Sequence, residues 1–370
     1  MFEFELVAES ENARAGILKT PHGNIHTPIF MPVGTRATVK TLSPKEIEEV
    51  GSEIILGNTY HLYLRPGHEL IQKAGGIHQF MGWKKPVLTD SGGFQVMSLK
   101  GLRKITPEGV RFQSHIDGSY HFFSPEKVME IQNALGADII MSFDECPPYP
   151  ATKKYVSESL KLTLDWAKRG KIAHQNSKQA LFGIVQGGVF EDLRQESAER
   201  LMEMDFPGYS IGGLAVGESK ENMLKITKFL NKILPKNKPR YLMGVGTPLD
   251  LLNNIENGID MFDCVMPTRN ARKGTIFTSK GKMIIKSARY KEDIAPIDED
   301  CKCYACRNFS RAYIRHLFSV DEILGMRLAT IHSLHFYLKL IKAARKAIIE
   351  SNFKKFKNKV ALEIGSEKIV

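Results

Sequence analysis

The stretch Met261-Phe-Asp-Cys-Val-Met-Pro-Thr-Arg-Asn-Ala-Arg-Lys-Gly274 joins a short apolar run to a basic segment, and one carboxylate, Asp263, lies at the junction. Because proline interrupts a buried strand, we expect Pro267 to begin an exposed turn and Asp263 to lie where strand becomes loop. Barrel enzymes keep their catalytic side chains at that position. Three side chains that bind phosphate follow, namely Arg269, Arg272 and Lys273. Taken alone, the stretch also fits a turn-capping aspartate beside a solvated basic loop.

Seven earlier runs share this design of a short apolar segment that ends at a polar or glycine residue and precedes a helical pattern. The eight runs cover residues 29–33, 53–58, 86–90, 137–144, 180–186, 209–214, 241–244 and 259–263. Helix-start signals, a Ser or Thr cap followed by proline, stand between them at Ser43-Pro44, Ser124-Pro125 and Thr247-Pro248. Apolar strands alternating with helices predict a parallel sheet that is buried on both faces.

Eight such units predict an α/β fold, a closed (β/α)₈ TIM barrel, in preference to a doubly wound open sheet. No dinucleotide-type glycine fingerprint follows the first run, which further disfavours the open sheet. We expect residues 1–370 to form a single barrel domain with two additions. Residues 95–123 read as a β-hairpin turning at Asp117-Gly118, and residues 277–335 as a metal-binding subdomain after the eighth strand. Residues 339–359 predict one basic amphipathic helix.

Charge and composition indicate a globular protein with a polyanionic partner. The chain has 52 Lys+Arg against 41 Asp+Glu, a formal net charge of +11, which favours nucleic acid. Acidic residues interrupt the first six positions, and no run approaches the ~20 apolar residues of a membrane span. We therefore expect a cytoplasmic protein that has neither a secretory signal nor a membrane segment.

Polar residues end the predicted strands, and a barrel would gather them at one mouth. They are Asn58, Asp90, Asp144, Gln186, Gly213, Gly244 and Asp263. Three carboxylates in one mouth are costly to leave unpaired, so a set of unrelated turn caps is the weaker interpretation. One carboxylate can attack carbon, a second can move a proton, and a third can bind a planar ligand together with an amide and glycine N–H groups.

Three of the five cysteines crowd into Cys301-Lys-Cys303-Tyr-Ala-Cys306. Soft ligands at this spacing indicate a metal in a reducing compartment instead of a disulfide framework. A histidine would complete a closed tetrahedral zinc set of a structural kind. Spacing alone leaves both His332 and His335 open as the fourth ligand.

Several motifs together resemble the bacterial-type tRNA-guanine transglycosylases of the queuosine pathway, and the resemblance covers nearly the whole chain. The segments that carry it are 90–95 (Asp-Ser-Gly-Gly-Phe-Gln), 142–146 (Ser-Phe-Asp-Glu-Cys), 184–188 (Ile-Val-Gln-Gly-Gly), 212–218 (Gly-Gly-Leu-Ala-Val-Gly-Glu), 261–269 and the cysteine cluster. The resemblance implies a zinc-containing TIM barrel that exchanges guanine at the anticodon wobble position of G-U-N tRNAs (Asp, Asn, His, Tyr) for a 7-deazaguanine. It also implies a homodimer that binds the tRNA anticodon loop.

Site roles follow from the same resemblance. It implies that Asp263 is the nucleophile on ribose C1′ and that Asp90 is the general acid/base. The residues implied to bind the base are Asp144, Gln186, Gly213, Leu214, Phe94, Cys146, Met243 and Glu218. The residues implied to contact RNA are Arg269, Arg272 and Lys273, and the implied zinc ligands are Cys301, Cys303, Cys306 and His332.

Small departures from the family pattern refine these expectations. Phe94 stands where some members have Tyr, so stacking on the base is expected without a hydroxyl contact. Lys273 replaces a common Asn and adds charge. Val216, beside the base pocket, suits the smaller substrate preQ1 more than queuine.

Three alternative functions fit the sequence less well. A non-catalytic RNA-binding partner subunit of a transglycosylase heterodimer is disfavoured because both Asp90 and Asp263 are present. An archaeal-type enzyme would carry RNA-binding domains beyond His332, where we expect no room for them. A zinc-dependent barrel hydrolase would need a histidine ligand cluster at the mouth, and the strand ends supply carboxylates instead.

Overall fold

Eight short parallel strands form one sheet in the computed structural model of the chain, which describes residues 2–99 and 101–365. The strands are β4 (Ile29–Met31), β5 (Ile55–Gly57), β6 (Val87–Thr89), β10 (Ile139–Met141), β11 (Ala180–Val185), β12 (Tyr209–Ile211), β13 (Arg240–Leu242) and β14 (Met261–Asp263). Their order is β4-β14-β13-β12-β11-β10-β6-β5. A parallel bridge between Val33 and Leu56 joins the two ends of this order. The predicted TIM barrel and all eight predicted strands are therefore confirmed.

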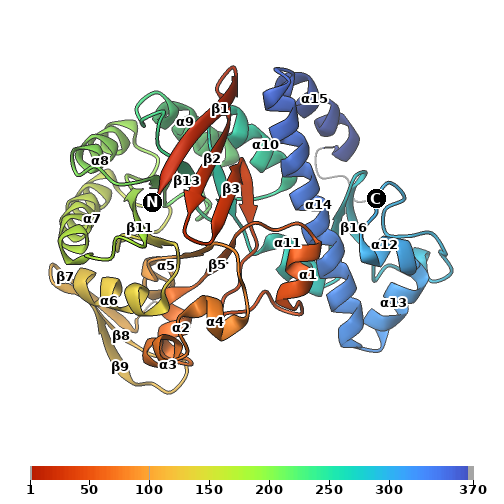
Figure 1. Ribbon diagram of the computed structural model, residues 1–370, viewed down its shortest axis with the longest axis horizontal. Coiled ribbons are helices and arrows are strands. Elements are labelled where there is room, and N and C mark those ends of the chain that lie inside the picture. Colours follow the sequence, from red (N-terminus) through yellow and green to blue (C-terminus); the bar gives the residue numbers. More distant parts are fainter. Residues whose placement is uncertain (1, 100, 366–370) are drawn as a thin grey trace.

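Helices alternate with these strands and surround them (Figure 1). They are α1 (Pro44–Glu49), α2 (Thr59–Leu64), α3 (His68–Lys73), α4 (Ile77–Met81), α5 (Gly93–Met97), α6 (Pro125–Leu135), α7 (Lys153–Ala173), α8 (Glu191–Glu203), α9 (Lys220–Asn231), α10 (Pro248–Glu256) and α11 (Met266–Arg272). The three expected caps are confirmed, because Ser43, Ser124 and Thr247 each accept a hydrogen bond from a backbone N–H of the first turn. Proline follows each cap, where the helix needs no N–H donor.

An antiparallel sheet that the sequence reading missed covers the end of the barrel where the strands begin. It comprises β1 (Glu3–Ser10), β2 (Ala13–Thr20) and β3 (Gly23–Thr27), the red strands at the centre of Figure 1. Leu18 and Ile25 pack with the inward-facing residues of the barrel strands. The buried guanidinium of Arg14 lies 3.4 Å from Asp260, just before β14. The sheet therefore covers this end of the barrel and leaves the strand-end residues at the opposite mouth.

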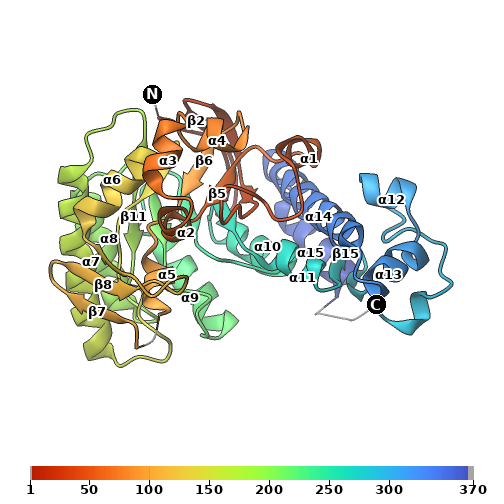
Figure 2. The same cartoon turned by 90° about the horizontal axis from the view of Figure 1, so that it is seen from below.

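The segment between α5 and α6 contains a three-stranded antiparallel sheet of β7 (Arg103–Thr106), β8 (Gly109–Gln113) and β9 (Tyr120–Phe123). Asp117 and Gly118 lie between β8 and β9, where a hairpin turn was expected, and β7 adds a strand to that hairpin. Trp166 of α7 donates a hydrogen bond to the Pro107 carbonyl at 2.8 Å. The sheet is thereby held against α7, as Figure 2 shows.

After β14 the chain builds a separate layer and then returns to the barrel. The layer contains β15 (Thr275–Thr278), β16 (Gly281–Ile284), η1 (Ala288–Tyr290), α12 (Tyr304–Asn308) and α13 (Arg311–Ser319). The long helix α14 (Ile323–Ile349) runs from α12 and α13 back across β1, β2 and β4 (Figures 1 and 2). It therefore joins this layer to the barrel wall.

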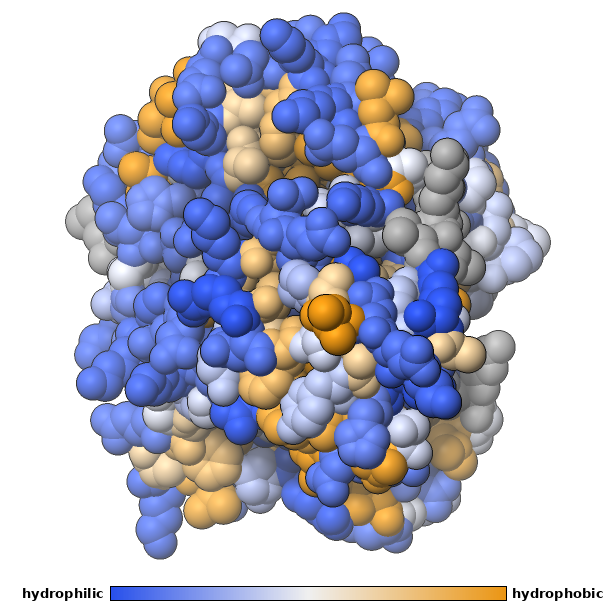
Figure 3. Space-filling model, turned by 90° about the vertical axis from the view of Figure 1, so that its right-hand side faces the viewer, coloured by the Kyte–Doolittle hydropathy of each residue, from blue (hydrophilic) through white to orange (hydrophobic). Residues whose placement is uncertain are grey.

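The expected single helix over residues 339–359 is wrong. Helix α14 ends at Ile349, Ser351 adopts a left-handed φ of 54°, and α15 (Phe353–Ile364) begins after it. Figure 3 shows that hydrophilic residues cover most of the face on this side of the molecule and separate its small apolar patches. Within the described residues, no helix combines the length and apolar character needed to cross a bilayer.

Candidate active site

The strand-end residues meet at one rim because all eight strands point the same way around a closed barrel. Hydrogen bonds link neighbouring positions of this rim. Asn58, after β5, donates to Asp90, after β6, at 2.6 Å. Gln186, after β11, donates to Asp144, after β10, at 2.8 Å. These contacts pair residues from neighbouring strand ends, as expected for side chains gathered at one mouth.

Asp263 closes β14, and only one of its carboxylate oxygens is engaged. Oδ1 accepts hydrogen bonds from the Tyr241 hydroxyl at 2.6 Å and from the Gly244 N–H at 2.7 Å. Oδ2 accepts no hydrogen bond from the described residues. Burial raises the pKa of Asp263 to about 6; the Asp90 charge adds to the rise, and the Tyr241 and Gly244 donors oppose it. A half-buried carboxylate with one free oxygen and a pKa near neutrality is suited to nucleophilic attack.

Asp90 is buried and held by three donors. Its Oδ2 accepts from the side-chain amides of Asn58 and of Gln95, the latter at 2.8 Å, while Oδ1 accepts from the Thr59 N–H at 2.8 Å. Burial nevertheless raises the pKa of Asp90, since all three donors are neutral. A carboxyl group whose pKa is raised by burial holds a proton more readily than an exposed one, which is the property that a general acid needs.

Asp144 lies at the floor of the same mouth. Ser91 donates to its Oδ1 at 2.9 Å and Gln186 to its Oδ2 at 2.8 Å. Burial raises the pKa of Asp144 to about 6, and the charges of Asp90 and Glu145 contribute to the rise. The amide oxygen of Gln186 is buried without a hydrogen-bond partner among the described residues. Together these groups present a fixed set of donors and acceptors to a planar ligand.

The loop after β12 is shaped by Glu218. Its two oxygens accept from the Ala215 N–H at 2.5 Å and from the Val216 N–H at 3.0 Å. Because a trans peptide holds its C=O opposite its N–H, the Leu214 carbonyl points away from Glu218. Gly213 has a φ of 64°, and a Cβ there would lie 2.3 Å from the Gln186 amide oxygen. Only glycine fits at this close approach.

The other residues expected to bind the base follow the ends of their strands. Phe94, on α5, leaves 57% of its surface exposed, so its ring is free to stack on a ligand. Met243 follows β13 and is half-buried. Burial raises the pKa of the Cys146 thiol to about 12, which keeps it protonated and excludes it as a thiolate nucleophile.

The basic segment after Asp263 is a helix, which corrects the expected loop. Pro267 lies in the first turn of α11 and is buried, a position where proline favours a helix. Arg269 and Lys273 are exposed, and Arg272 is half-buried. One guanidinium nitrogen of Arg272, Nη1, is buried without a hydrogen-bond partner among the described residues. Burial and the neighbouring Arg269 charge lower the pKa of Arg272.

Four residues form a compact group that could hold a metal ion, and they are the predicted set Cys301, Cys303, Cys306 and His332. Their ligand atoms lie within 4.8 Å of one another, and His332 is fully buried. The His332 Nδ1 faces the sulfurs, 3.2 Å from Cys306 Sγ, while Nε2 donates to the Phe277 carbonyl at 3.0 Å. That second contact fixes the tautomer that presents Nδ1 to a metal. His335 does not belong to the group.

A second group, His22, His78 and Asp138, lies at the closed end of the barrel. The two imidazole rings stack with centroids 3.6 Å apart and planes within 15°. Each ring hydrogen-bonds its own oxygen of Asp138, at 2.8 and 3.0 Å. Because each ring already uses one nitrogen to contact Asp138, and the two rings pack face to face, we interpret this group as a hydrogen-bonded brace.

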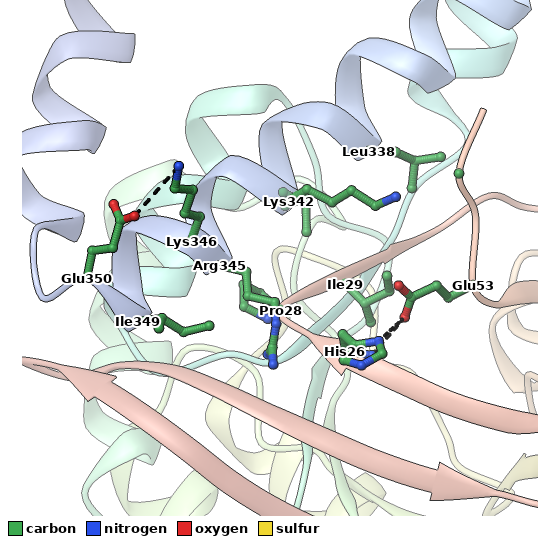
Figure 4. A pocket seen from close by; sticks show the side chains of 12 residues that line it. His26, Pro28, Ile29, Glu53, Leu338, Lys342, Arg345, Lys346, Ile349 and Glu350 are labelled. Carbon is green, nitrogen blue, oxygen red and sulfur yellow. Dashed lines mark hydrogen bonds and ion pairs between the residues drawn. The ribbon is translucent and has the colours of Figure 1, made fainter. Parts of the chain in front are cut away.

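A cavity of about 340 Å³ also lies away from the mouth, between α14 and the start of β4 (Figure 4). Lys342, Arg345 and Lys346 of α14 approach it from one side. Across from them, His26 lies 3.1 Å from Glu53. Acidic and basic side chains are mixed around this cavity, and it contains none of the strand-end residues.

Two contributors to the site were not predicted. Tyr241 reads in the sequence as an ordinary apolar strand residue, and only the inward side of β13 reveals its contact with Asp263. Ser91 was noted only within its motif. The Gly93 N–H donates to the Ser91 hydroxyl at 3.1 Å, and this positions Ser91 to donate to Asp144.

Comparison with known proteins gives one consistent answer. A family model described as queuine tRNA-ribosyltransferase matches residues 9–365. The queuine tRNA-ribosyltransferase of Thermoanaerobacter sp. (strain X514) is 64% identical over 355 residues, which cover 96% of this chain and 95% of that protein. The protein of the same name from Fusobacterium nucleatum subsp. nucleatum is 61% identical over 350 residues and 94% of each chain.

Proposed function

This chain belongs to the queuine tRNA-ribosyltransferase family and is a tRNA-guanine transglycosylase, and we propose that it replaces the wobble guanine of G-U-N anticodons with preQ1 by two displacements at Asp263. The observation that carries this proposal is the state of Asp263, whose Oδ1 is fixed by two donors while Oδ2 is free. The enzyme is a pentosyltransferase, because the ribose carbon changes its nitrogen partner.

In the first displacement, Asp263 Oδ2 gives an electron pair to ribose C1′, and the bond from C1′ to the guanine nitrogen breaks. Asp90 supplies the proton that neutralises the departing guanine. In the second displacement, the incoming base gives its ring N–H proton to Asp90 and attacks C1′, which releases the Asp263 carboxylate. Two inversions retain the configuration at C1′, as in a retaining glycosidase. The wobble base must leave its stack, which is cheap in a single-stranded anticodon loop.

We assign base recognition to Asp144, Gln186, and the backbone of Gly213 and Leu214. The Asp144 carboxylate accepts from the amino face of the purine, and the Gly213 N–H donates to its carbonyl. The Leu214 carbonyl, turned away from Glu218, accepts from the aminomethyl ammonium that distinguishes preQ1 from guanine. Phe94 and Met243 stack on the ring faces, beside Cys146.

We assign contacts with the RNA backbone to α11 and to Lys273, which follows it. Arg269 and Lys273 are exposed next to the nucleophile, and the unpartnered Nη1 of Arg272 supports a phosphate contact. Zinc is the ion assigned to Cys301, Cys303, Cys306 and His332, since three thiolates and one imidazole form a closed tetrahedral set. Its role is structural. We also propose a cytoplasmic homodimer.

Labelled-guanine incorporation tests the function. Purified enzyme should place labelled guanine into a tRNA with a G-U-N anticodon, and unlabelled preQ1 should then displace that label much faster than queuine does. A tRNA with adenine at the wobble position is the control and should remain unlabelled. Failure to label the G-U-N tRNA would refute the exchange, whereas faster displacement by queuine would refute only the choice of preQ1. A non-catalytic partner subunit would label neither tRNA.

A further inference from the structure

We propose that Tyr241 is a positioning residue that decides which oxygen of Asp263 attacks the ribose and supports the carboxylate when it is released. The proposal rests on the proposed role of Asp263 as nucleophile. Tyr241 sits in the middle of β13, pairs with Met261 of β14, and is fully buried inside the barrel. From there its hydroxyl donates to Asp263 Oδ1 at 2.6 Å.

The geometry separates the two carboxylate oxygens. Oδ1 receives the Tyr241 hydroxyl from below and the Gly244 N–H at 2.7 Å from the adjoining loop. Both lone-pair directions of that oxygen are then occupied, so its attack on carbon would require one of these hydrogen bonds to break. Oδ2 has no such bond among the described residues and is the oxygen free to form the bond to C1′.

Tyr241 remains a donor throughout the reaction. Burial, together with the negative charge of Asp263, raises its pKa well above the ordinary tyrosine value, so the hydroxyl keeps its proton at working pH. The charged or titratable groups that act on Asp263 and Tyr241 are Asp90, from the end of β6, and the Cys264 thiol. Neither of these is a cation, so neutral hydrogen bonds are what hold the carboxylate.

The contact acts differently in the two displacements. In the first, Asp263 loses its charge as the ester bond to C1′ forms, and the Tyr241 hydrogen bond weakens. In the second, the C1′–Oδ2 electron pair returns to Asp263, and the hydroxyl stabilises the charge that reappears. Removing the Tyr241 hydroxyl should therefore slow the breaking of the bond between Asp263 and C1′ more than its formation.

The test compares Tyr241→Phe with Tyr209→Phe. Tyr209 is a buried tyrosine on the adjacent strand β12, and the hydrogen bonds that Asp263 accepts from described residues come from Tyr241 and Gly244 instead. For Tyr241→Phe we expect turnover to fall on the order of tenfold to a hundredfold, as for loss of one hydrogen bond to a charged group. The covalent RNA–enzyme intermediate should persist longer after preQ1 is added. The acid limb of kcat/KM should move upward by about one pH unit, because a donor that lowers the Asp263 pKa is gone.

A purely structural role would lower the melting temperature of Tyr241→Phe and leave the acid limb and the intermediate's lifetime unchanged. That result would overturn the proposal. Asp263→Asn is run alongside as a separate check. If Asp263→Asn still forms the covalent intermediate, Asp263 is not the nucleophile and the proposed mechanism is refuted. If it loses the intermediate while Tyr241→Phe behaves like Tyr209→Phe, only the role of Tyr241 is refuted.

Discussion

The buried carboxylate of Asp263 lowers the stability of the folded protein when it is charged. Its carboxyl has an ordinary pKa of 3.8 but a pKa of about 6 in the folded protein, mainly because burial disfavours the charge. The folded state therefore binds this proton more tightly than the unfolded chain does. Ionisation of Asp263 consequently lowers the stability of the fold as pH rises from about 4 through about 6.

We predict that Asp263→Asn raises the melting temperature by a few degrees at pH 8, since the substitution removes a poorly solvated charge and keeps the acceptor for Tyr241. Near pH 4, where the wild-type carboxyl is already protonated, the difference should disappear. Thermal unfolding at the two pH values checks this. Equal melting temperatures at pH 8 would mean that the Asp263 charge is well solvated.

At the scale of the element, α11 places the arginines that we propose to contact RNA directly after Asp263. The helix begins three residues after Asp263, so its arginines are held at a fixed distance from the proposed nucleophile. A flexible loop, as the sequence suggested, would have left that distance variable. The buried Pro267 in the first turn stabilises this arrangement.

We predict that Arg269→Ala weakens tRNA binding and reduces the slope of log affinity against log salt by roughly 0.7–0.9, the value for one lost phosphate contact. Arg200→Ala is the matched control, because Arg200 is exposed on the last turn of α8, on the barrel's outer wall. Binding measured at several salt concentrations provides both slopes. An Arg269→Ala slope equal to that of Arg200→Ala would exclude the phosphate contact.

The long helix α14 carries His332, so a metal ion held by His332 and the three cysteines would tie the cysteine cluster to the barrel wall. We predict that His332→Ala lowers bound zinc below one per chain and lowers the melting temperature. His335→Ala should keep both values near wild type, since His335 lies three residues further along the same helix and outside the ligand group. Metal analysis and thermal unfolding of the two variants decide the assignment. Full zinc in His332→Ala would contradict it.

For the whole molecule, the sequence was sufficient to predict the barrel, its eight strands and the residues at their ends. Buried parallel strands appear in the sequence as continuous apolar runs, and the residue after each run lies at the mouth of the barrel. The eightfold repetition of such runs therefore indicates both the fold and the residues of the rim. The antiparallel sheet β1–β3 was missed because β1 alternates between exposed and half-buried residues, a pattern that was read only for the absence of a signal peptide.

Other features depend on contacts between distant segments and were not readable from the sequence. The break between α14 and α15 is a different case, because it contains Ser351 and Asn352, polar residues that signal a helix end although one continuous basic helix was expected. Tyr241 reaches Asp263 only because β13 and β14 are neighbours in the barrel. The difference between the hydrogen-bonded Oδ1 and the free Oδ2 of Asp263 likewise depends on the pairing of β13 with β14.

The most direct measurement is the location of the covalent link in the trapped RNA–enzyme complex. Wild-type enzyme is mixed with a G-U-N anticodon stem-loop in the absence of a second base, quenched with acid, digested and analysed by mass spectrometry. The peptide that contains Asp263 should carry the ribose-linked RNA fragment, and Asp263→Asn should give no adduct although it still binds the stem-loop. An adduct on the Asp90 peptide, or an Asp263→Asn protein that still traps RNA, would contradict the assignment of Asp263 as the nucleophile.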